Sequence, residues 1–262
     1  MSDHPYLLGA RRPRVLAHRG LVTADAAAVG VAENSARAVA DAVSAGAQFV
    51  ESDCHLTRDG VVVLFHDDNL RRVLGDPRTL LEVDVAELRA LMAPRGGLIT
   101  LEEALERFPS TRFYIDVKAD AATAAVGPII APHTDRVLLT AFADRRRRAA
   151  TAAVMQAGAR RRPAASPGSM TVLRVLVAVW LGSRRLLARA LRDIDALQIP
   201  ERQGPVRVLT PRLISMAHRA GVEVHVWTIN EVDAMRRLAD AGVDGIVTDR
   251  ADVALTLFEE RP

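Results

Sequence analysis

The sequence of 262 residues contains little cysteine and few aromatic residues, and each shortage excludes a class of protein. Cys54 is the only cysteine, so no disulfide can form within the chain, and a reducing compartment is expected. Aromatic residues make up 4% of the chain, too few for the stacking surfaces that bind nucleic acid. Residues 1–14 lack an apolar segment of signal-peptide length, and we therefore predict a cytoplasmic protein.

Lysine is almost absent as well. Lys118 is the single lysine among 35 basic residues, although the formal net charge is only +3. A lysine kept in so arginine-rich a chain indicates a need for its compact ammonium group, and chance survival is the alternative. The arginine runs 145–148 and 160–162 are interpreted as solvated surface charge, with docking to an anionic membrane or nucleic acid as the alternative.

Short apolar segments alternate with amphipathic helical patterns along the whole chain. Strands are predicted at 14–18, 49–56, 61–66, 112–118, 137–142, 164–166, 196–199, 223–228 and 245–248, and helices at 35–45, 101–107, 120–131, 144–157, 170–192, 211–220, 232–241 and 249–259. With 61–66 taken as a hairpin partner, about eight strand–helix units remain, which favours a single α/β domain over 1–262 with the (β/α)8 TIM-barrel fold. An open doubly wound sheet is the alternative, but no glycine-rich dinucleotide loop follows the first strand.

Two segments interrupt this alternation. Residues 67–100 are predicted to form a small insertion over the barrel mouth that faces the substrate. The apolar segment 170–191 contains Arg174, Arg184 and Arg185, so it is too short and too charged to span a membrane. We predict a helix packed on the barrel, with an interfacial membrane helix as the alternative, so membrane contact is possible but not favoured.

Potential functional side chains gather where the predicted strands end, which in a barrel is the functional face. These residues are His18, Glu51, Asp53, His66, Asp116, Lys118, Trp227 and Asp249. Glu51 and Asp53 stand two apart on one strand, so their carboxylates share a face and would repel each other unless a cation lies between them. Asp116 adds a third carboxylate beside Lys118, and such oxygen ligands suit Mg²⁺ or Ca²⁺, with Mn²⁺ possible.

The two strand-end histidines predict acid–base catalysis. His18 and His66 would face the carboxylate cluster and act as a general acid and a general base. Arg19 follows His18 directly and could bind a phosphate through two parallel hydrogen bonds, form a salt bridge with Glu33, or do both. The residues alone therefore favour a phosphoester-cleaving enzyme.

These motifs together resemble the glycerophosphodiester phosphodiesterase family. The resemblance runs in order through His18-Arg19-Gly20, Glu33-Asn34-Ser35, Glu51-x-Asp53, Thr57-x-Asp59-Gly60, His66-Asp67, the strand that ends in Lys118, Val226-Trp227-Thr228-Ile229-Asn230 and Asp244-Gly245-Ile246-Val247-Thr248-Asp249. It implies a metal-dependent TIM barrel that hydrolyses a small glycerophosphodiester to glycerol 3-phosphate and an alcohol in glycerophospholipid turnover.

The resemblance also implies a role for each matching residue. His18 and His66 are the implied acid and base, Glu51 and Asp53 the metal ligands with Asp116 as the third, Arg19 and Lys118 the phosphate contacts and Trp227 a pocket residue, with Glu33 in support. Asp116 stands where the family usually has glutamate, and its shorter arm alters the reach to the metal. Two other functions stay open: a lysophospholipase D that uses 170–191 as its lipid contact, and a catalytically weak binding or regulatory barrel.

Overall fold

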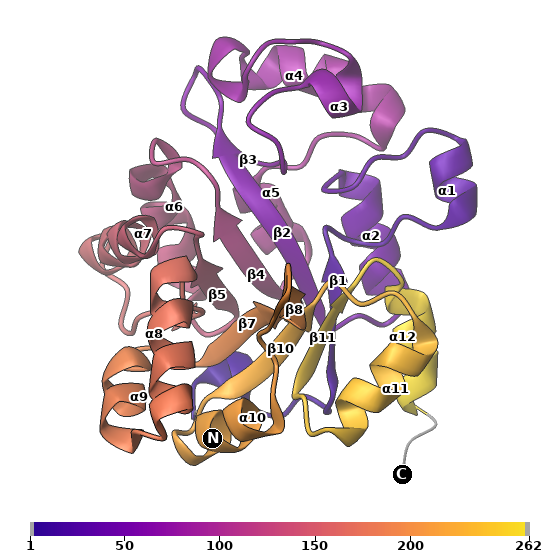
Figure 1. The fold of residues 1–262 in the computed structure, drawn as a ribbon. Helices are drawn as coiled ribbons and strands as arrows, with labels where there is room; N and C mark the ends of the chain where they lie inside the picture. Colours follow the sequence, from indigo (N-terminus) through magenta and orange to yellow (C-terminus); the bar gives the residue numbers. More distant parts are fainter. Residues whose placement is uncertain (1–2, 260–262) are drawn as a thin grey trace.

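The computed structural model describes residues 3–259, and within that range eight parallel strands form a nearly closed barrel (Figure 1). The neighbouring strands run in the order β6-β5-β4-β2-β1-β11-β10-β7, and at the remaining seam Asp195 N donates to Ala165 O at 2.9 Å. The prediction of a (β/α)8 barrel is confirmed. Its strands are β1 (Arg14–His18), β2 (Phe49–Leu56), β4 (Arg112–Val117), β5 (Val137–Thr140), β6 (Ala164–Ala165), β7 (Ala196–Pro200), β10 (Glu223–Trp227) and β11 (Gly245–Thr248).

Helices surround the barrel and begin where the sequence offers caps. Ser35 Oγ accepts from Ala38 N, and Thr100 and Glu103 cap each other's backbone N–H groups at the start of α5. The short helix α1 has no counterpart among the predicted helices. The helices are α1 (Ala24–Ala28), α2 (Ala36–Ser44), α5 (Leu101–Arg107), α6 (Ala122–Ile130), α7 (Asp144–Gln156), α8 (Ser169–Leu181), α9 (Arg184–Ala190), α10 (Pro211–Arg219), α11 (Val232–Asp240) and α12 (Ala251–Glu259).

The register of the strands brings the predicted site residues to one level. His18 on β1 lies beside Glu51 on β2, and Asp53 on β2 lies beside Asp116 on β4. At the other end of the barrel the short helix η1 (Pro5–Leu7) closes the interior, where Tyr6 meets the ring of Phe49 edge-on with the ring centroids 5.4 Å apart. The barrel is therefore sealed at its base and open at the carboxyl ends of its strands.

The segment between β2 and α5 forms a separate small unit. Strand β3 (Val62–Leu64) pairs antiparallel with β2, as the hairpin interpretation predicted. Beyond it lie α3 (Arg71–Leu74), η2 (Leu80–Glu82), α4 (Val85–Met92) and η3 (Ala93–Arg95) (Figure 1). Apolar side chains of α3, η2 and α4 pack in one cluster with Val63 and Phe65. The part of 67–100 that the structure describes contributes no side chain to the lining of the barrel-mouth cavity. The insertion therefore lines none of this cavity, and its predicted contact with the substrate stays a prediction.

The predicted helix 170–192 is two helices. Gly182 ends α8 in the left-handed conformation with a φ of 67°, and Ser183 caps α9 by accepting from Leu186 N. The break turns the chain, so that α8 lines the barrel mouth while α9 packs against α8 (Figure 1). Within residues 3–259 no helix has the length and apolar character to cross a membrane.

Candidate active site

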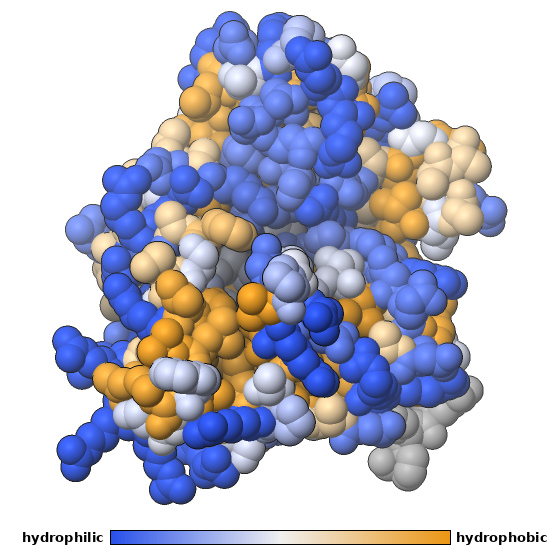
Figure 2. Space-filling model, viewed as in Figure 1, coloured by the Kyte–Doolittle hydropathy of each residue, from blue (hydrophilic) through white to orange (hydrophobic). Residues whose placement is uncertain are grey.

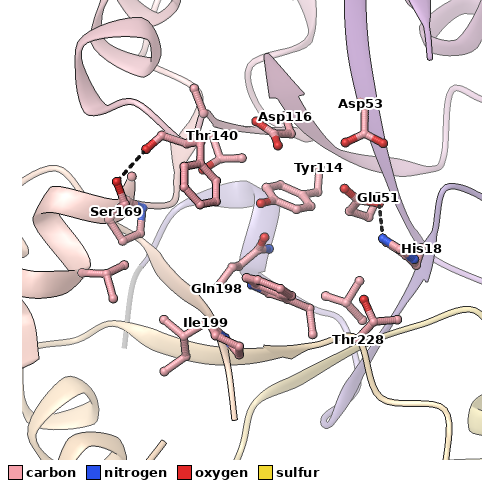
Figure 3. Close-up of a pocket in the computed structure, with 18 of the residues that line it drawn as sticks. His18, Glu51, Asp53, Tyr114, Asp116, Thr140, Ser169, Gln198, Ile199 and Thr228 are labelled. Atoms are coloured by element: carbon pink, nitrogen blue, oxygen red, sulfur yellow. Dashed lines mark hydrogen bonds and ion pairs between the residues drawn. The ribbon is translucent and has the colours of Figure 1, made fainter. Parts of the chain in front are cut away.

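A cavity of about 580 Å³ opens at the carboxyl ends of the barrel strands. Its wall includes eight of the nine predicted site residues, while Glu33 lies behind Arg19. Figure 2 shows the hollow at the centre of this face, with apolar residues gathered over α8 to its lower left. Figure 3 shows Glu51, Asp53 and Asp116 on one side of the cavity and His18 beside them. The predicted residues in the lining are His18, Arg19, Glu51, Asp53, His66, Asp116, Lys118 and Trp227.

The sequence His18-Arg19-Gly20 makes a tight turn that holds Glu51. Arg19 has a φ of +57°, and its backbone N donates to both the carbonyl and the Oε2 of Glu51, at 2.8 and 3.1 Å. Gly20 follows in the left-handed region, and a Cβ there would lie 2.6 Å from the backbone of Ala38 on α2. Only glycine fits so close to the helix, which explains the third residue of the motif.

Asn34 links the second motif to the metal-ligand candidates. Its Nδ2 donates to Asp53 Oδ2 at 3.1 Å, and its Oδ1 accepts from the buried Ser52 hydroxyl at 2.5 Å. Asn34 has a φ of +57°, a conformation that asparagine tolerates better than most residues. The motif Glu33-Asn34-Ser35 therefore orients Asp53 from outside the cavity.

His18 is held by a carboxylate from the far end of the chain. Its Nδ1 lies 2.6 Å from Asp249 Oδ1, and its Nε2 lies 3.9 Å from Glu51 Oε2. Asn230 donates to the other oxygen of Asp249 at 2.7 Å. The hydrogen bond from His18 lowers the pKa of Asp249, with a smaller contribution from Asn230. An ionised Asp249 fixes the proton on Nδ1 and leaves Nε2 facing the cavity.

His66, which follows β3, has the same arrangement. Its Nδ1 lies 2.5 Å from Asp67 Oδ1, and Arg72 Nε donates to Asp67 Oδ2 at 2.7 Å. Partial burial opposes ionisation of Asp67, but the hydrogen bonds from Arg72 and His66 outweigh it and lower the pKa of Asp67. Both histidines thus carry a carboxylate on Nδ1 and leave Nε2 as the nitrogen for chemistry.

Lys118 lies between two buried carboxylates. Its Nζ is 2.8 Å from Asp53 Oδ1 and 2.7 Å from Asp116 Oδ2. On the other side of Asp53, Arg19 Nε forms an ion pair at 3.2 Å, and Arg19 Nη1 donates to Glu33 at 2.7 Å. Of the two roles that the sequence left open for Arg19, the structure contains the ion pair with Glu33, and phosphate binding stays a prediction.

The pKa values of the three carboxylates shift in different directions. Burial raises the pKa of Glu51, and the neighbouring Asp53 raises it further. Burial also raises the pKa of Asp116 against the pull of Lys118. Asp53 is different, because Lys118 and Arg19 together overcome its burial and lower its pKa. Additional positive charge near Glu51 and Asp116 would favour the ionised form of both.

The carboxylate cluster has the donor chemistry for a hard cation. Asp116 Oδ1 is buried and has no hydrogen-bond partner in the described part of the chain, as expected of an oxygen that awaits a ligand. Glu51 and Asp53 offer further oxygens on the same strand face. Across residues 3–259 no three acidic, histidine or cysteine side chains are already gathered closely enough to hold a metal ion, since Lys118 occupies the space between Asp53 and Asp116.

The opposite wall of the cavity is largely apolar. Helix α8 contributes Val172, Leu173 and Leu176, and Phe142 and Trp227 stand at the rim, 72% and 39% exposed. Deeper in the cavity lie Tyr114 and Gln198, and the Gln198 Oε1 is buried without a hydrogen-bond partner among the residues described (Figure 3).

Several site residues carried no predicted role. Asp249 was recognised only as a strand-end carboxylate, and Asn34 and Asn230 only as members of motifs. No role was predicted from the sequence for Tyr114 or Gln198, although they lie on the barrel strands β4 and β7. The even spacing of Tyr114 and Asp116 was the available signal for Tyr114.

Comparison with known proteins agrees with this geometry. The sequence model of the glycerophosphoryl diester phosphodiesterase family matches residues 18–253. The chain is 38% identical over 241 residues to "probable glycerophosphodiester phosphodiesterase 2" of Mycobacterium tuberculosis, covering 91% of this chain and 88% of the relative. It is 25% identical to lysophospholipase D GDPD1 of Rattus norvegicus, covering 83% of this chain and 79% of that one.

A solved structure has the same fold. An Oleispira antarctica phosphodiesterase, determined in complex with the product sn-glycerol-3-phosphate, superposes with a TM-score of 0.71 at 21% identity and covers 95% of this chain and 98% of its own. With the family motifs at the barrel mouth and the match over most of its length, the chain belongs to the glycerophosphoryl diester phosphodiesterase family and is an enzyme of that class.

Proposed function

We propose that this enzyme hydrolyses small glycerophosphodiesters with a divalent cation, and that the described cavity is its active site. The observation that supports this most strongly is the symmetry of the two histidines. Each has Nδ1 on a carboxylate, at 2.6 Å for His18 and 2.5 Å for His66, and both line the cavity that holds the cluster of carboxylates and cations. Such a pair suits a reaction in which one oxygen loses a proton and another gains one.

Glu51, Asp53 and Asp116 would hold the cation, Mg²⁺ or Ca²⁺, with Mn²⁺ possible. When bound, the cation supplies positive charge to a phosphate oxygen and stabilises the charge that develops there. Arg19 and Lys118 would bind the remaining phosphate oxygens, Arg19 through its planar guanidinium and Lys118 as a point charge. Glu33 keeps the Arg19 guanidinium in place, and Trp227 would pack against the substrate at the rim.

The proton transfers belong to the two histidines. One imidazole accepts a proton at Nε2 from the attacking hydroxyl, which comes from water or from the neighbouring glycerol hydroxyl. That oxygen forms a bond to phosphorus as the bond from phosphorus to the leaving oxygen breaks. Where the glycerol hydroxyl attacks, the product of this step is a cyclic phosphodiester, and a water molecule then adds to its phosphorus and breaks the ring P–O bond to give glycerol 3-phosphate. The other imidazole, protonated beforehand, donates its Nε2 proton to the leaving alcohol. Asp249 and Asp67 hold the two rings by their Nδ1–H groups throughout.

A second substrate class is favoured by the apolar wall of the cavity. Val172, Leu173 and Leu176 on α8 form a surface that a deacylated headgroup would not need. The hydrocarbon chain of a lysophospholipid fits it, and a relative carries the name lysophospholipase D. Activity on glycerophosphocholine compared with lysophosphatidylcholine tests this. Leu176→Ser should reduce the second activity more than the first, and an equal reduction would remove the wall from substrate selection.

The leaving-group experiment tests the assignment of the histidines. His18→Ala and His66→Ala should each lower turnover by roughly 10²–10⁴-fold on glycerophosphocholine. On a nitrophenyl phosphodiester, whose leaving group needs no proton, the variant that lacks the acid should recover selectively. Equal loss on both substrates for both variants would contradict the two roles.

Removing the metal distinguishes a metal-dependent enzyme from a barrel that only binds its ligand. EDTA should abolish activity, and Mg²⁺, Mn²⁺ or Ca²⁺ should restore it in the wild type. Glu51→Gln and Asp53→Asn should lower turnover by about 10²-fold at limiting metal, as expected for lost ligands. Undetectable turnover under all these conditions would favour the binding or regulatory barrel. The cytoplasm remains our proposed location, because Cys54 is buried and free.

A further inference from the structure

A second cavity lies outside the barrel among α7, α8 and α9. It measures about 1040 Å³, and its wall holds six arginines but one acidic residue, Asp193. We call it the arginine cleft. Its apolar side chains are half-exposed, and Leu173 on α8 also lines the active-site cavity, so the two sites share a wall. The arginines are Arg147, Arg148, Arg162, Arg174, Arg189 and Arg192.

Arg147 is the unusual member of this group. Its side chain is only 9% exposed, yet its closest ion-pair partner is Asp144, at 3.8 Å, and its Nε has no hydrogen-bond partner within residues 3–259. One turn further along α7, the buried Thr151 hydroxyl also lacks a partner in the described structure. Two buried polar groups left open on one helix face indicate a ligand that would bond to both.

Arg14, the other buried arginine in the described range, and the partly buried Arg136 are more fully engaged. Arg14 pairs with Glu223 through Nε and Nη2 at 2.8 Å each, and Arg136 donates to the backbone carbonyls of Thr111 and Phe108 at 3.0 and 3.2 Å. A buried arginine without such contacts is therefore an exception to how this fold treats its guanidinium groups. Burying a charge with a single, distant ion-pair partner is costly, so the exception needs a reason.

The rim of the cleft adds uncompensated positive charge. Among its arginines, Arg162 pairs with Asp195 at 2.6 Å, whereas Arg148, Arg174 and Arg189 make no ion pair with any residue in the described range. Asp144, the partner of Arg147, is itself engaged, because its two oxygens accept from the backbone N of Gly168 and Thr171 at the start of α8. The cleft thus offers guanidinium groups and almost no counter-charge.

We propose that the arginine cleft binds the phosphate group of an amphiphilic anion, with Arg147 as the buried contact and Arg148, Arg174 and Arg189 at the rim. Guanidinium groups match phosphate oxygens in geometry and charge. The apolar part of the ligand would lie on half-exposed side chains that no other element covers. These are Met155, Leu173, Val177 and Leu186, between 41% and 52% exposed. An anionic phospholipid headgroup and a free phosphate ester with a hydrocarbon tail share this chemistry.

The test compares two triple variants. R148Q/R174Q/R189Q removes three exposed arginines from the cleft, and R107Q/R219Q/R236Q removes three exposed arginines from α5, α10 and α11 as a matched control. The probes are vesicles of phosphatidylglycerol with phosphatidylcholine, vesicles of phosphatidylcholine alone, and octyl phosphate below its micelle-forming concentration. Binding is measured by cosedimentation for the vesicles and by titration calorimetry for octyl phosphate. Octyl phosphate that enters the active site does so in both variants and cancels in the comparison.

If the ligand is a lipid, the wild type and the control should bind the anionic vesicles, and the cleft variant should bind them about 10²-fold more weakly, since each arginine near an anionic surface contributes roughly fivefold. If the ligand is a free phosphate ester, none of the proteins should bind the vesicles. The cleft variant should then lose a binding site for octyl phosphate that the control keeps. Arg147→Met, with folding verified by circular dichroism, should weaken the same binding. Equal behaviour of cleft and control variants with every probe would overturn the proposal.

Discussion

Replacement of Lys118 by methionine should destabilise the metal-free protein and make it responsive to divalent cations. Lys118 Nζ lies 2.8 Å from Asp53 and 2.7 Å from Asp116, and both carboxylates are buried. Methionine keeps the length of the arm but removes the only charge between them. Two acidic groups would then face each other in a region of low dielectric.

The size of the loss follows from the burial of the partners. Removing one member of a buried ion pair costs about 3–5 kcal/mol, because the other charge is left without compensation. The Lys118 side chain is 26% exposed, so solvent screens part of this, and we expect a loss of about 2–3 kcal/mol. In a chain of this size that lowers the melting temperature by roughly 5–10 °C.

The loss should depend on pH in a defined direction. In the wild type, Lys118 and Arg19 overcome burial and lower the pKa of Asp53, so Asp53 stabilises the fold above its ordinary pKa of 3.8 and ceases to do so as the pH falls through its folded-state value. In Lys118→Met this contribution is reduced, and Asp53 and Asp116 take up protons at higher pH. The difference in stability between wild type and variant should therefore be largest near pH 7 and shrink towards about pH 4.

Thermal melts with and without Mg²⁺ provide the measurement. A divalent cation replaces the missing charge, so Mg²⁺ should raise the melting temperature of Lys118→Met more than that of the wild type. Arg58→Met is the control, because the Arg58–Asp84 ion pair is exposed and its loss should leave the melting temperature nearly unchanged. Wild-type stability in metal-free Lys118→Met at pH 7, with equal responses of both proteins to Mg²⁺, would refute the reasoning.

Three further changes test other parts of the site and fold. Asp249→Asn should lower turnover by about 10²-fold with little change in the melting temperature, because His18 loses the carboxylate that fixes its ring; steady-state kinetics decide this. Asp116→Glu should lower the Mg²⁺ concentration at half-maximal activity, since the longer arm reaches further into the cluster, and an unchanged Mg²⁺ titration would contradict it. Glu223→Gln should cost about 3 kcal/mol in urea unfolding at pH 7, because it breaks the buried pair with Arg14. Burial opposes ionisation of Glu223, but the hydrogen bond from Arg14 outweighs it and lowers its pKa, so this difference should close in acid and a pH-independent difference would contradict it.

The barrel and the position of the site were predictable because both follow from periodic rules. The eight apolar segments set the number of strands, and parallel strands bring their carboxyl ends to one rim. Glu51 and Asp53 share a face by their spacing alone. Asp116 joins them because β2 and β4 are neighbours in the sheet, with Asp53 and Asp116 in register. This pairing is long-range, but it is expected because consecutive strands of a barrel are neighbours.

The insertion and the apolar segment 170–192 depended on tertiary packing. Residues 67–100 were predicted to lie over the barrel mouth. In the structure, Leu70, Leu80 and Leu88 pack on β3 and hold the insertion beside the cavity. The break after α8 had a local signal, since Gly182-Ser183 combines a left-handed residue with a helix cap. The apolar residues on both sides of Gly182 favoured one long helix over a break. In the structure, apolar residues of α8 line the active-site cavity and the arginine cleft.

The residues that orient the catalytic groups could not be assigned from sequence, because their partners are distant and atom-specific. Asp249 is 231 residues from His18, and only the structure reveals which ring nitrogen it meets. Lys118 was assigned only in part. The sequence predicted its ammonium beside the phosphate and the carboxylates; the structure has it between Asp53 and Asp116, and its contact with phosphate stays a prediction.

Charge balance reconciles the two positions of Lys118. When ionised, Glu51, Asp53 and Asp116 face only Lys118 and Arg19 as cations of the inner cluster, which leaves one negative charge in excess. Burial and, after it, the charge of Asp53 raise the pKa of Glu51, and a proton on Glu51 would remove that excess. A divalent cation would reverse the excess to one positive charge and would free Lys118 from the two aspartates. A phosphodiester carries one negative charge, so the loaded cluster attracts it with the lysine now available as its partner.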